Sequence, residues 1–417
     1  MEKGRLFEYL QERGLIYQTT NDDKVKELIN GEPIAIYCGI DPTADSLHIG
    51  HTFSLFMLRR FQQAGHKIIV LLGGATAKIG DPSGRNDMRN MVTNEFIQNN
   101  YENIKSIIGR FVKLDGENPA TIVNNADWMN GYDYVSFMRD IGSNFNVKHM
   151  LQNDSCVSRL NAGGLTFFEM GYMLIQAYDF VYLNRNYGCK LQIGGSDQWG
   201  NIIAGVELGR KLNFQEGKDE EGYQALVTPL LTNSEGKKMG KTAKGAVWLD
   251  PNKTTPFEFY QYWRNVDDAD VMKCIKMLTF IPMDKIKEME AWEDNRINEK
   301  KEVLAYELTA LVHGEEEAIK AQTSAKALFS GCGDDENMPT TTIPAEEIGD
   351  GIFIADLMVK CNLCTSKGEA KRLIQQGGVS VNDEVVKDLG SNYKLADFEA
   401  GVKIRKGKKV FHKAILG

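Results

Sequence analysis

Short apolar runs alternate with longer amphipathic stretches through the first half of the chain. Residues 33–39, 67–73, 121–124 and 225–231 are rich in apolar, strand-favouring residues. Residues 52–61 follow the first run and repeat their apolar positions at helical spacing, and long helical patterns lie between the other runs. This alternation predicts an α/β fold with a mostly parallel sheet that helices cover on both faces.

The second half has a different pattern. Residues from 255 to about 329 give almost only helical signals, as in the stretch 298–312. A segment rich in Gly, Thr, Pro and acidic residues follows and is typical of a linker. We therefore expect an α/β domain at residues 1–225, a lysine-rich loop region at 226–254 and a helical domain at 255–329. A linker at 330–351 and a small α+β domain at 352–417 should follow.

Residues 167–183 predict a buried helix, because they are apolar on nearly every face. Three polar residues, Tyr172, Gln176 and Asp179, nevertheless fall at i, i+4 and i+7 on one face. Burying an unpaired carboxylate is costly, so this stripe should face a ligand or a partner group. An ion pair between Asp179 and a structural arginine is the alternative.

Composition limits the class of protein. At 417 residues the chain is long enough for two or three domains, and no run of about 20 apolar residues predicts a membrane span. The first residues lack the apolar core of a secretory signal. Seven scattered cysteines favour free thiols in the reducing cytoplasm. Cys361 and Cys364 form a lone CxxC pair that, without a second pair or nearby histidines, is best read as small apolar residues of a helix.

Charge is unevenly distributed along the chain. The formal net charge of −8 argues against a nucleic-acid partner for the whole chain. Residues 352–417, however, contain 12 Lys and Arg against 7 Asp and Glu, whereas the remainder contains 37 against 50. The C-terminal segment is therefore the candidate for contact with a nucleic acid.

Residues 41–51 connect the first expected strand to the first long helix and place His48 and His51 at the helix start. Free backbone N–H groups and the positive end of the helix dipole suit a phosphate there, and two imidazoles at i and i+3 add donors. Ordinary cap residues are one alternative. A zinc site is another, but no nearby carboxylate or cysteine completes a ligand set.

A second cationic segment lies about 190 residues further along. Lys237, Lys238 and Lys241 crowd a small-residue loop at 234–243 that could close over an anion, although a solvated loop would show the same charges. A P-loop is excluded because Glu235 stands where GxxxxGK[ST] requires glycine.

Two further segments are rich in glycine and short polar residues, and the first of them follows the expected strand at 67–73. Residues 73–85 are glycine-rich and carry Asp81 and Arg85, although the loop alone predicts only a turn. Residues 192–201 combine a Gly-Gly turn with short polar residues, which suits close approach to a ribose or a substrate, or a plain turn.

The histidine and lysine segments together resemble the two signatures of class I aminoacyl-tRNA synthetases. The HIGH signature is intact as His48-Ile-Gly-His51, and the KMSKS signature is present as Lys238-Met-Gly-Lys-Thr242 with two departures. The ordered set of motifs at 37–43, 80–84, 172–179 and 192–201 narrows the resemblance to the bacterial-type tyrosyl-tRNA synthetase family, from the first strand to the C-terminus. Tryptophanyl-tRNA synthetases are the nearest rival family.

This resemblance implies a Rossmann-like catalytic domain with L-tyrosine and ATP as substrates. Tyr37 and Asp179 would bind the phenol hydroxyl of tyrosine, and Asp81, Tyr172 and Gln176 the α-ammonium. The nucleotide would contact a larger set of residues: Cys38, Gly39, Asp41, Thr43, His48, Gly50, His51, Gly195, Asp197, Gln198 and Lys241.

The resemblance also implies the chemistry. Tyrosine would be activated as tyrosyl-adenylate and then transferred to tRNA(Tyr), without a protein nucleophile. Thr43 and His48 would stabilise the phosphates, with His51 at the ribose. Lys238 and Lys241 would hold the leaving pyrophosphate on a mobile loop, assisted by Arg85 and Arg89. Mg²⁺ would enter with ATP, so no protein metal site and no prosthetic group are expected.

The C-terminal segment resembles an S4 RNA-binding domain. Lys367, Lys371 and Arg372 recur at i, i+4 and i+5 on one expected helix face, where they would contact phosphates. A solvated helix face is the alternative. The family implies a cytoplasmic homodimer. Two rival classes are an RNA-binding protein on a degenerate synthetase scaffold and a nucleotidyltransferase that uses no tRNA.

Overall fold

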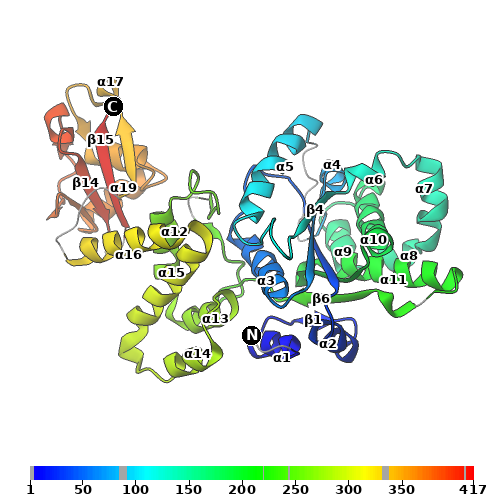
Figure 1. The fold of residues 1–417 in the computed structure, drawn as a ribbon. Coiled ribbons are helices and arrows are strands. Elements are labelled where there is room, and N and C mark those ends of the chain that lie inside the picture. The colour runs from blue at the N-terminus through cyan, green and yellow to red at the C-terminus, as the bar shows by residue number, and fades with distance from the viewer. Residues whose placement is uncertain (1–3, 84–91, 219, 243–244, 331–337, 408–409) are drawn as a thin grey trace. The chain divides into compact units, whose positions relative to one another are not determined.

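The computed structural model describes residues 4–83, 92–218, 220–242, 245–330, 338–407 and 410–417. Within these ranges the chain forms two compact units (Figure 1). The first unit comprises residues 1–241, 246–250 and 267–300, and the second comprises residues 242–245, 251–266 and 301–417.

A six-stranded sheet forms the centre of the first unit. Its strands are β1 (Gln18–Thr19), β2 (Ala35–Ile40), β3 (Lys67–Leu72), β4 (Thr121–Asn124), β5 (Cys189–Gly195) and β6 (Gln224–Thr228). The order is β1-β6-β5-β2-β3-β4, and every neighbouring pair is parallel except β1 with β6. The predicted mostly parallel sheet is confirmed.

Strand order creates a topological switch point at the centre of this sheet. β2 lies between β3 and β5, so the chain builds β3 and β4 on one side of β2 and later β5 and β6 on the other. Ligands of open α/β sheets bind at such a switch point, beyond the carboxyl ends of the central strands. Residues 41–51 follow the end of β2 and residues 196–198 follow the end of β5, so both candidate segments start at this switch point.

Helices cover both faces of the sheet, as the sequence predicted. α3 (Thr52–Gln63) and α5 (Asn94–Ile108) lie on one face, and α10 (Phe167–Tyr187) and α11 (Trp199–Gln215) lie on the other (Figure 1). The remaining α-helices of this unit are α1 (Leu6–Glu12), α2 (Asp22–Asn30), α4 (Thr76–Ile79), α6 (Ala126–Met129), α7 (Tyr134–Asp140), α8 (Val147–Met150), α9 (Asp154–Asn161), α13 (Asp268–Leu278) and α14 (Met283–Glu290).

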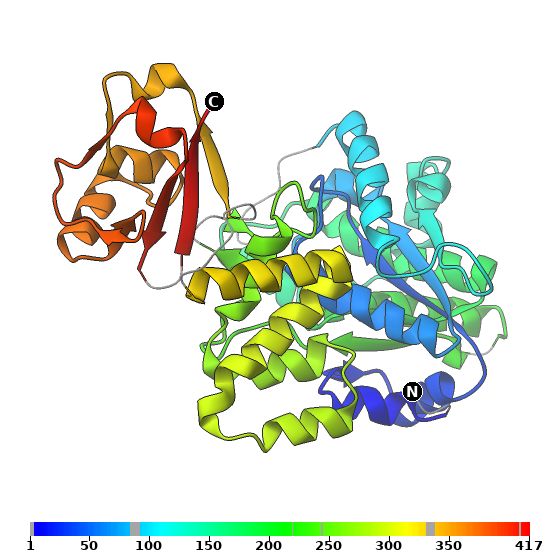
Figure 2. The ribbon, with the colours of Figure 1, turned by 60° about the vertical axis from the view of Figure 1, so that its left-hand side comes forward.

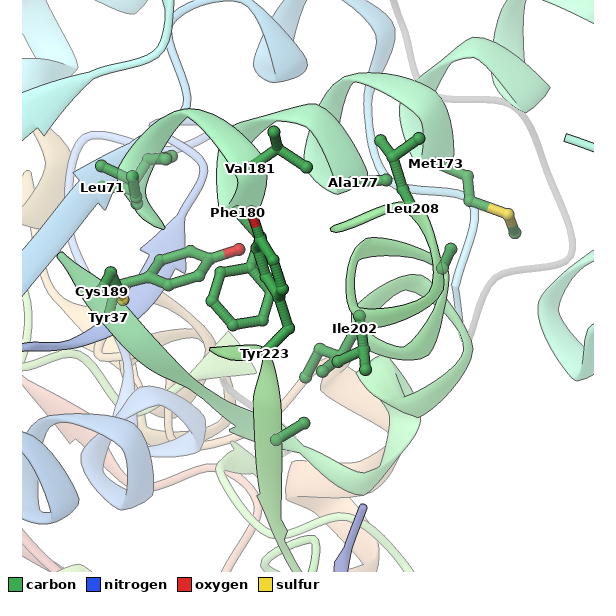
Figure 3. Close-up of a cluster of buried hydrophobic side chains, with 14 of the residues drawn as sticks. Tyr37, Leu71, Met173, Ala177, Phe180, Val181, Cys189, Ile202, Leu208 and Tyr223 are labelled. Carbon is green, nitrogen blue, oxygen red and sulfur yellow. The ribbon is translucent and has the colours of Figure 1, made fainter. Parts of the chain in front are cut away.

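The helix α10 has well-defined ends and a buried body. Thr166 and Glu169 form a reciprocal capping box at its start, and Glu169 also accepts from the buried Arg159 at 2.8 Å. Gly188 ends the helix in the left-handed conformation. Figure 3 shows the side chains of α10 packed with those of β2 and α11 in one apolar cluster, where the rings of Tyr37 and Phe180 lie 5.3 Å apart.

Two buried arginines fix the end of α13. Arg13 Nη1 donates to the carbonyl of Thr279 at 2.8 Å, and Arg60 Nη2 donates to the same carbonyl at 2.7 Å. Carbonyl groups at a helix C-terminus carry partial negative charge, so they offset part of the cost of removing these guanidinium groups from water. α13 in turn binds the residues that precede the lysine loop, because Lys273 donates to the carbonyl of Thr232 at 2.8 Å and Asp270 accepts from the Ser234 amide at 3.0 Å.

The second unit contains the helices α12 (Pro256–Arg264) and α16 (Glu315–Ser330), and most of α15 (Ile297–His313). A small α/β part follows, with β9 (Thr340–Ile343), α17 (Ala345–Ile348), β10 (Ile352–Phe353), α18 (Ile354–Lys360), α19 (Lys367–Gln375), β11 (Val379–Val381), β12 (Glu384–Val385), β13 (Asn392–Tyr393), β14 (Val402–Lys406) and β15 (Val410–Leu416). Five of these strands form one sheet in the order β12-β11-β14-β15-β9. Figure 2 shows the last strand before the C-terminus, in red, within this part of the chain.

Part of the expected linker at 330–351 belongs to this sheet. β9 pairs in parallel with β15, with Thr341 opposite Ala414, and α17 follows it directly. The expectation of a linker throughout this segment was therefore wrong. Its three consecutive β-branched threonines favour a strand, whereas the surrounding Gly, Pro and acidic residues dominated the sequence pattern.

Cys361 and Cys364 lie in the apolar core of the C-terminal part. They are 0% and 6% exposed, and burial raises the pKa of Cys364. The expected small apolar character agrees with this burial, but the two residues lie between α18 and α19 and not, as we had expected, within a helix.

Candidate active site

The histidine segment forms a tight turn after β2. His48 caps a short 3-10 helix at Ile49–His51, and α3 begins at Thr52. The Gly50 amide donates to His48 Nδ1 at 3.0 Å, and the His48 amide donates to His51 Nδ1 at 3.2 Å. A Cβ atom on Gly50 would lie 2.7 Å from the His48 ring, so only glycine allows this arrangement. These contacts therefore hold both imidazoles in fixed positions in the turn that follows β2.

Asp179 is held by neutral donors deep in the first unit. Its side chain is 1% exposed, and its two oxygens accept from Asn125 Nδ2 at 3.0 Å and Trp128 Nε1 at 2.9 Å. Burial raises the pKa of this carboxyl to about 7, while the two hydrogen bonds oppose the rise. The ion pair with arginine that we also considered does not occur, because no arginine is among the described donors to Asp179.

Asp41 joins the loop after β2 to α10. Its carboxylate accepts from the hydroxyl of Tyr172 at 2.9 Å and from the hydroxyl of Thr76 at 2.7 Å. Asn125 donates to the same Thr76 oxygen at 3.1 Å and to Asp179. One chain of hydrogen bonds thus links Tyr172 and Asp179, the two ends of the polar stripe on α10. The structure unites these two predicted tyrosine-site residues with Asp41, a predicted nucleotide-site residue.

Asp81 lies at another strand-end loop and contacts the segment after β5. Gln198 Nε2 donates to Asp81 at 2.7 Å, and Asn201 Nδ2 lies 3.4 Å from the other carboxylate oxygen. Ile79, two residues before Asp81, packs near Gly171 on α10. Asp81, predicted to bind tyrosine, therefore lies beside Gln198, predicted to bind the nucleotide.

Buried polar atoms without partners also lie near this site. Among the described side chains, Tyr37 Oη, Gln176 Oε1 and Gln192 Oε1 are buried without a hydrogen-bond partner. Tyr37 and Gln192 are register partners on the adjacent strands β2 and β5. Burial raises the pKa of the Tyr37 hydroxyl well above its ordinary value, so it remains a neutral donor at physiological pH. Such atoms are costly unless a polar ligand completes their hydrogen bonds.

The lysine loop lies directly against the histidine segment. The amide of Val247 donates to the carbonyl of Gly240 at 2.9 Å, and the carbonyl of Val247 accepts from the Ile49 amide at 3.0 Å. Gly240 has φ of +100°, and a Cβ atom there would lie 2.7 Å from Ile49 Cγ1. Lys238 Nζ forms an ion pair with Asp197 at 3.0 Å.

The other predicted nucleotide-site residues lie along the same loops. Cys38 is buried, and burial raises the pKa of its thiol to about 11, while the neighbouring Gly39 is exposed. The Thr43 amide donates to the Asp41 carbonyl at 2.8 Å, and Gly195 ends β5. Arg85, Arg89 and the side chain of Lys241 lie outside the described residues.

The sequence pattern missed several residues that shape the site. Asn125 and Trp128 follow β4, so their position at the carboxyl end of a parallel strand was the available signal. Thr76, Asn201 and Gln192 also gave no individual signal. Their importance depends on contacts with residues that are distant in the sequence.

Two structural features are absent from the described residues. No three His, Cys, Asp or Glu side chains among them are placed to hold a metal ion. Within the same ranges, no helix has the length and apolar character needed to cross a membrane.

Family comparison agrees with this geometry. Residues 29–330 match the family described as "tRNA synthetases class I (W and Y)", and the chain belongs to this family. Residues 333–414 match the "Tyrosine--tRNA ligase SYY-like C-terminal domain" family.

Individual relatives are similar over nearly the whole chain. It is 50% identical over 412 residues to the "Tyrosine--tRNA ligase" of Acetivibrio thermocellus and 49% identical over 412 residues to that of Clostridium tetani, with 99% of each chain covered in both cases. A C-terminally truncated mitochondrial tyrosyl-tRNA synthetase from Aspergillus nidulans has a similar structure, with a TM-score of 0.69, 32% identity and coverage of 78% of this chain and 94% of that chain.

Proposed function

We propose that the protein activates L-tyrosine with ATP and transfers it to tRNA(Tyr). The single observation that carries the active-site assignment is the contact of Gly240 with Ile49 and, through Val247, with the backbone of the histidine segment. This contact brings the backbone next to Lys241 against the imidazole-bearing turn, so one nucleotide can meet both signatures.

Tyrosine is the better substrate for the buried end of the site. The Tyr37 hydroxyl and the Asp179 carboxylate are polar groups placed deep among apolar side chains. A phenol hydroxyl would donate to Asp179 and accept from Tyr37, whereas an indole ring offers only a single N–H donor. A site built to bond a hydroxyl rejects substrates that lack it, since its own groups are then left unpaired. Asp81, Tyr172 and Gln176 receive the α-ammonium group.

Activation begins when the tyrosine carboxylate attacks the α-phosphate of ATP. A carboxylate–phosphorus bond forms, the bond to the β-phosphate oxygen breaks, and pyrophosphate leaves. Thr43 and His48 stabilise the phosphates, and the lysines neutralise the leaving group. Asp197 and Gln198 hold the ribose together with His51. Mg²⁺ would enter with ATP and would offset the charge of its phosphates, and we assign no residue of the protein to hold it. The terminal ribose hydroxyl of tRNA then attacks the activated carbonyl, and AMP leaves.

Tyrosine-dependent ATP–pyrophosphate exchange tests the activation step. Each standard amino acid is supplied in turn, and tyrosine alone should support rapid exchange. Lys241→Ala should lower kcat for exchange about a hundredfold, while the dissociation constant for tyrosine stays within about twofold. Exchange that depends on tryptophan instead would overturn the assignment, and unchanged kcat in Lys241→Ala would remove the lysine from the pyrophosphate site.

We infer that the C-terminal part binds tRNA. Lys367, Lys371 and Arg372 are exposed on α19, and Lys367 also forms an ion pair with Asp356 of α18. Lys371 and Arg372 therefore offer the more available positive charge to a phosphate backbone.

Charge-neutral variants in the full chain test this inference. The double change Lys371→Gln and Arg372→Gln should raise KM for tRNA about tenfold and leave exchange unchanged. Lys105→Gln, at an exposed lysine of α5, is the matched control. A deletion should remove residues 338–417, because a cut at 352 would leave β9 without β15. Full-rate charging by the double variant would exclude these residues.

We also propose that the protein is a homodimer. Among the described residues between positions 134 and 168, seven large apolar side chains are exposed: Tyr134, Val135, Val147, Val157, Leu160, Phe167 and Phe168. A second copy of the chain would remove these side chains from water. Sedimentation equilibrium should show a dimer that Phe167→Arg converts to monomers and that Tyr17→Arg, at another exposed tyrosine, leaves intact. A monomeric starting protein would contradict this proposal.

We place the reaction in the cytoplasm. The seven cysteines of the sequence are odd in number and scattered along the chain, which is typical of a protein in a reducing compartment.

A further inference from the structure

Residues 246–249 form a short strap between the two signature segments. The Leu249 amide donates to the carbonyl of Leu47 at 2.8 Å, and the Ile49 amide donates to the carbonyl of Val247 at 3.0 Å. His48 and Trp248 therefore face each other in an antiparallel bridge. The strap also holds the lysine loop, because the Val247 amide donates to the carbonyl of Gly240.

Burial anchors this strap. Leu47, Ile49, Val247 and Leu249 are 2%, 0%, 6% and 0% exposed. Two residues on each side of the bridge thus fill apolar space, which leaves His48 and Trp248 as the partly exposed pair between them. The backbone cannot shift at Trp248 without removing its buried neighbours from the core.

The indole of Trp248 limits the position of the His48 imidazole. The two rings meet edge to face, with centroids 6.1 Å apart and planes inclined by 69°. The His51 ring lies on another side of His48, with a centroid distance of 4.3 Å. The Gly50 amide donates to His48 Nδ1, so in the neutral ring Nε2 carries the proton. Trp248 and Gly50 together set where this Nε2–H donor points.

We propose that Trp248 is a positioning residue for His48 in tyrosine activation, acting through ring contact and not through contact with the substrate. The strap also ties the lysine loop to the same imidazole, so its backbone sets the separation of the two groups that flank the triphosphate. This inference rests on the proposed role of His48 as a donor to the phosphates. An imidazole that loses its neighbour samples other orientations, and small misplacements of a catalytic donor are costly.

A double-mutant cycle tests the inference in the full-length protein. Trp248→Leu should lower kcat for tyrosine-dependent exchange about tenfold or more, with KM for tyrosine within about twofold. Trp248→Phe keeps an aromatic edge and should retain kcat within about threefold. In a His48→Ala background, Trp248→Leu should change kcat by less than about twofold, because no imidazole remains to be positioned.

Several controls separate positioning from folding. Trp292→Leu removes a tryptophan of the same unit that packs on Arg296, and kcat should not change. Thermal unfolding of all variants identifies any that do not fold, and Trp248→Phe keeps the test usable if Trp248→Leu is one of them. An equal loss of kcat with and without His48 would overturn the inference and leave the His48 role intact. If His48→Ala alone left kcat unaltered, both the inference about Trp248 and the proposed role of His48 would be overturned.

Discussion

The proposed active site has a tyrosine end and a nucleotide end, and the two ends are built by different means. At the tyrosine end, Asp179 is buried and both of its oxygens already accept from fixed neutral donors. At the nucleotide end, Lys238 is 56% exposed in its ion pair with Asp197, and the loop position comes from backbone bonds and the close contact of Gly240.

This difference follows from what each end must recognise. A buried, prearranged carboxylate discriminates between neutral side chains, because a wrong substrate leaves polar groups unpaired at low dielectric. Exposed lysines attract any phosphate but are individually weak and screened by salt. The nucleotide end therefore depends on backbone geometry for its accuracy, and the tyrosine end depends on burial.

Asp179→Asn should have the largest effect. One amide oxygen cannot accept from Asn125, Trp128 and a substrate hydroxyl as the carboxylate can, so kcat/KM for tyrosine should fall about 10²–10³-fold. Phenylalanine offers no hydroxyl, so its kcat/KM should change little. Exchange assays with tyrosine and with phenylalanine measure the ratio of the two kcat/KM values. If Asp179→Asn left this ratio unchanged, the buried carboxylate would not be what selects tyrosine.

Gly240→Ala should have the next largest effect. Its methyl group would collide with Ile49, so the loop should move away from the histidine turn and kcat for exchange should fall about 10–10²-fold. Gly236→Ala is the matched control, since Gly236 also has positive φ (+77°) but no atom within 4 Å of its ideal Cβ. If Gly240→Ala and Gly236→Ala lowered kcat equally, backbone strain alone, and not the contact with Ile49, would explain the effect.

The pH dependence of tyrosine binding should be intermediate in size. The pKa of Asp179 is about 7, so its ionised share rises from about a tenth at pH 6 to about nine tenths at pH 8. If ionised Asp179 accepts the phenol hydroxyl, the dissociation constant should fall about tenfold over this range. Equilibrium dialysis measures it, and Asp179→Asn should give a flat profile.

The protonation of Asp179 should also make the free energy of unfolding depend on pH. The pKa of Asp179 is raised from an ordinary 3.8, so the folded state holds a proton that the unfolded state releases. The free energy of unfolding should therefore fall as the pH rises from about 4 to about 7, and Asp179→Asn should remove this contribution.

Lys238→Gln should have the smallest effect on stability. The pair with Asp197 is largely exposed, so its loss should change the free energy of unfolding by less than about 1 kcal/mol. Urea denaturation measures this change, with the isosteric variant Asp197→Asn as the partner in a mutant cycle. A coupling of several kcal/mol would show that the nucleotide end also depends on burial.

Local pattern was sufficient for most elements of the first unit. The strands β2, β3 and β4 and the helix α10 lie where the apolar runs predicted them, since side-chain periodicity depends only on neighbours in the chain. The signature residues were likewise visible, because a turn rich in Gly and His and a cluster of lysines are local features. β9 escaped prediction, because its β-branched residues became a strand only beside β15.

By itself, the sequence determined most elements of the first unit, the polar stripe on α10 and the two charged segments. Only the tertiary structure decided which groups those segments meet. Strand order places β5 beside β2, which brings Gln198 to Asp81 across 117 positions of the chain. The tertiary structure also decided that Asn125 and Trp128, and not an arginine, hold Asp179, and that Trp248 faces His48. Such contacts depend on the summed packing of distant elements, which local periodicity does not encode.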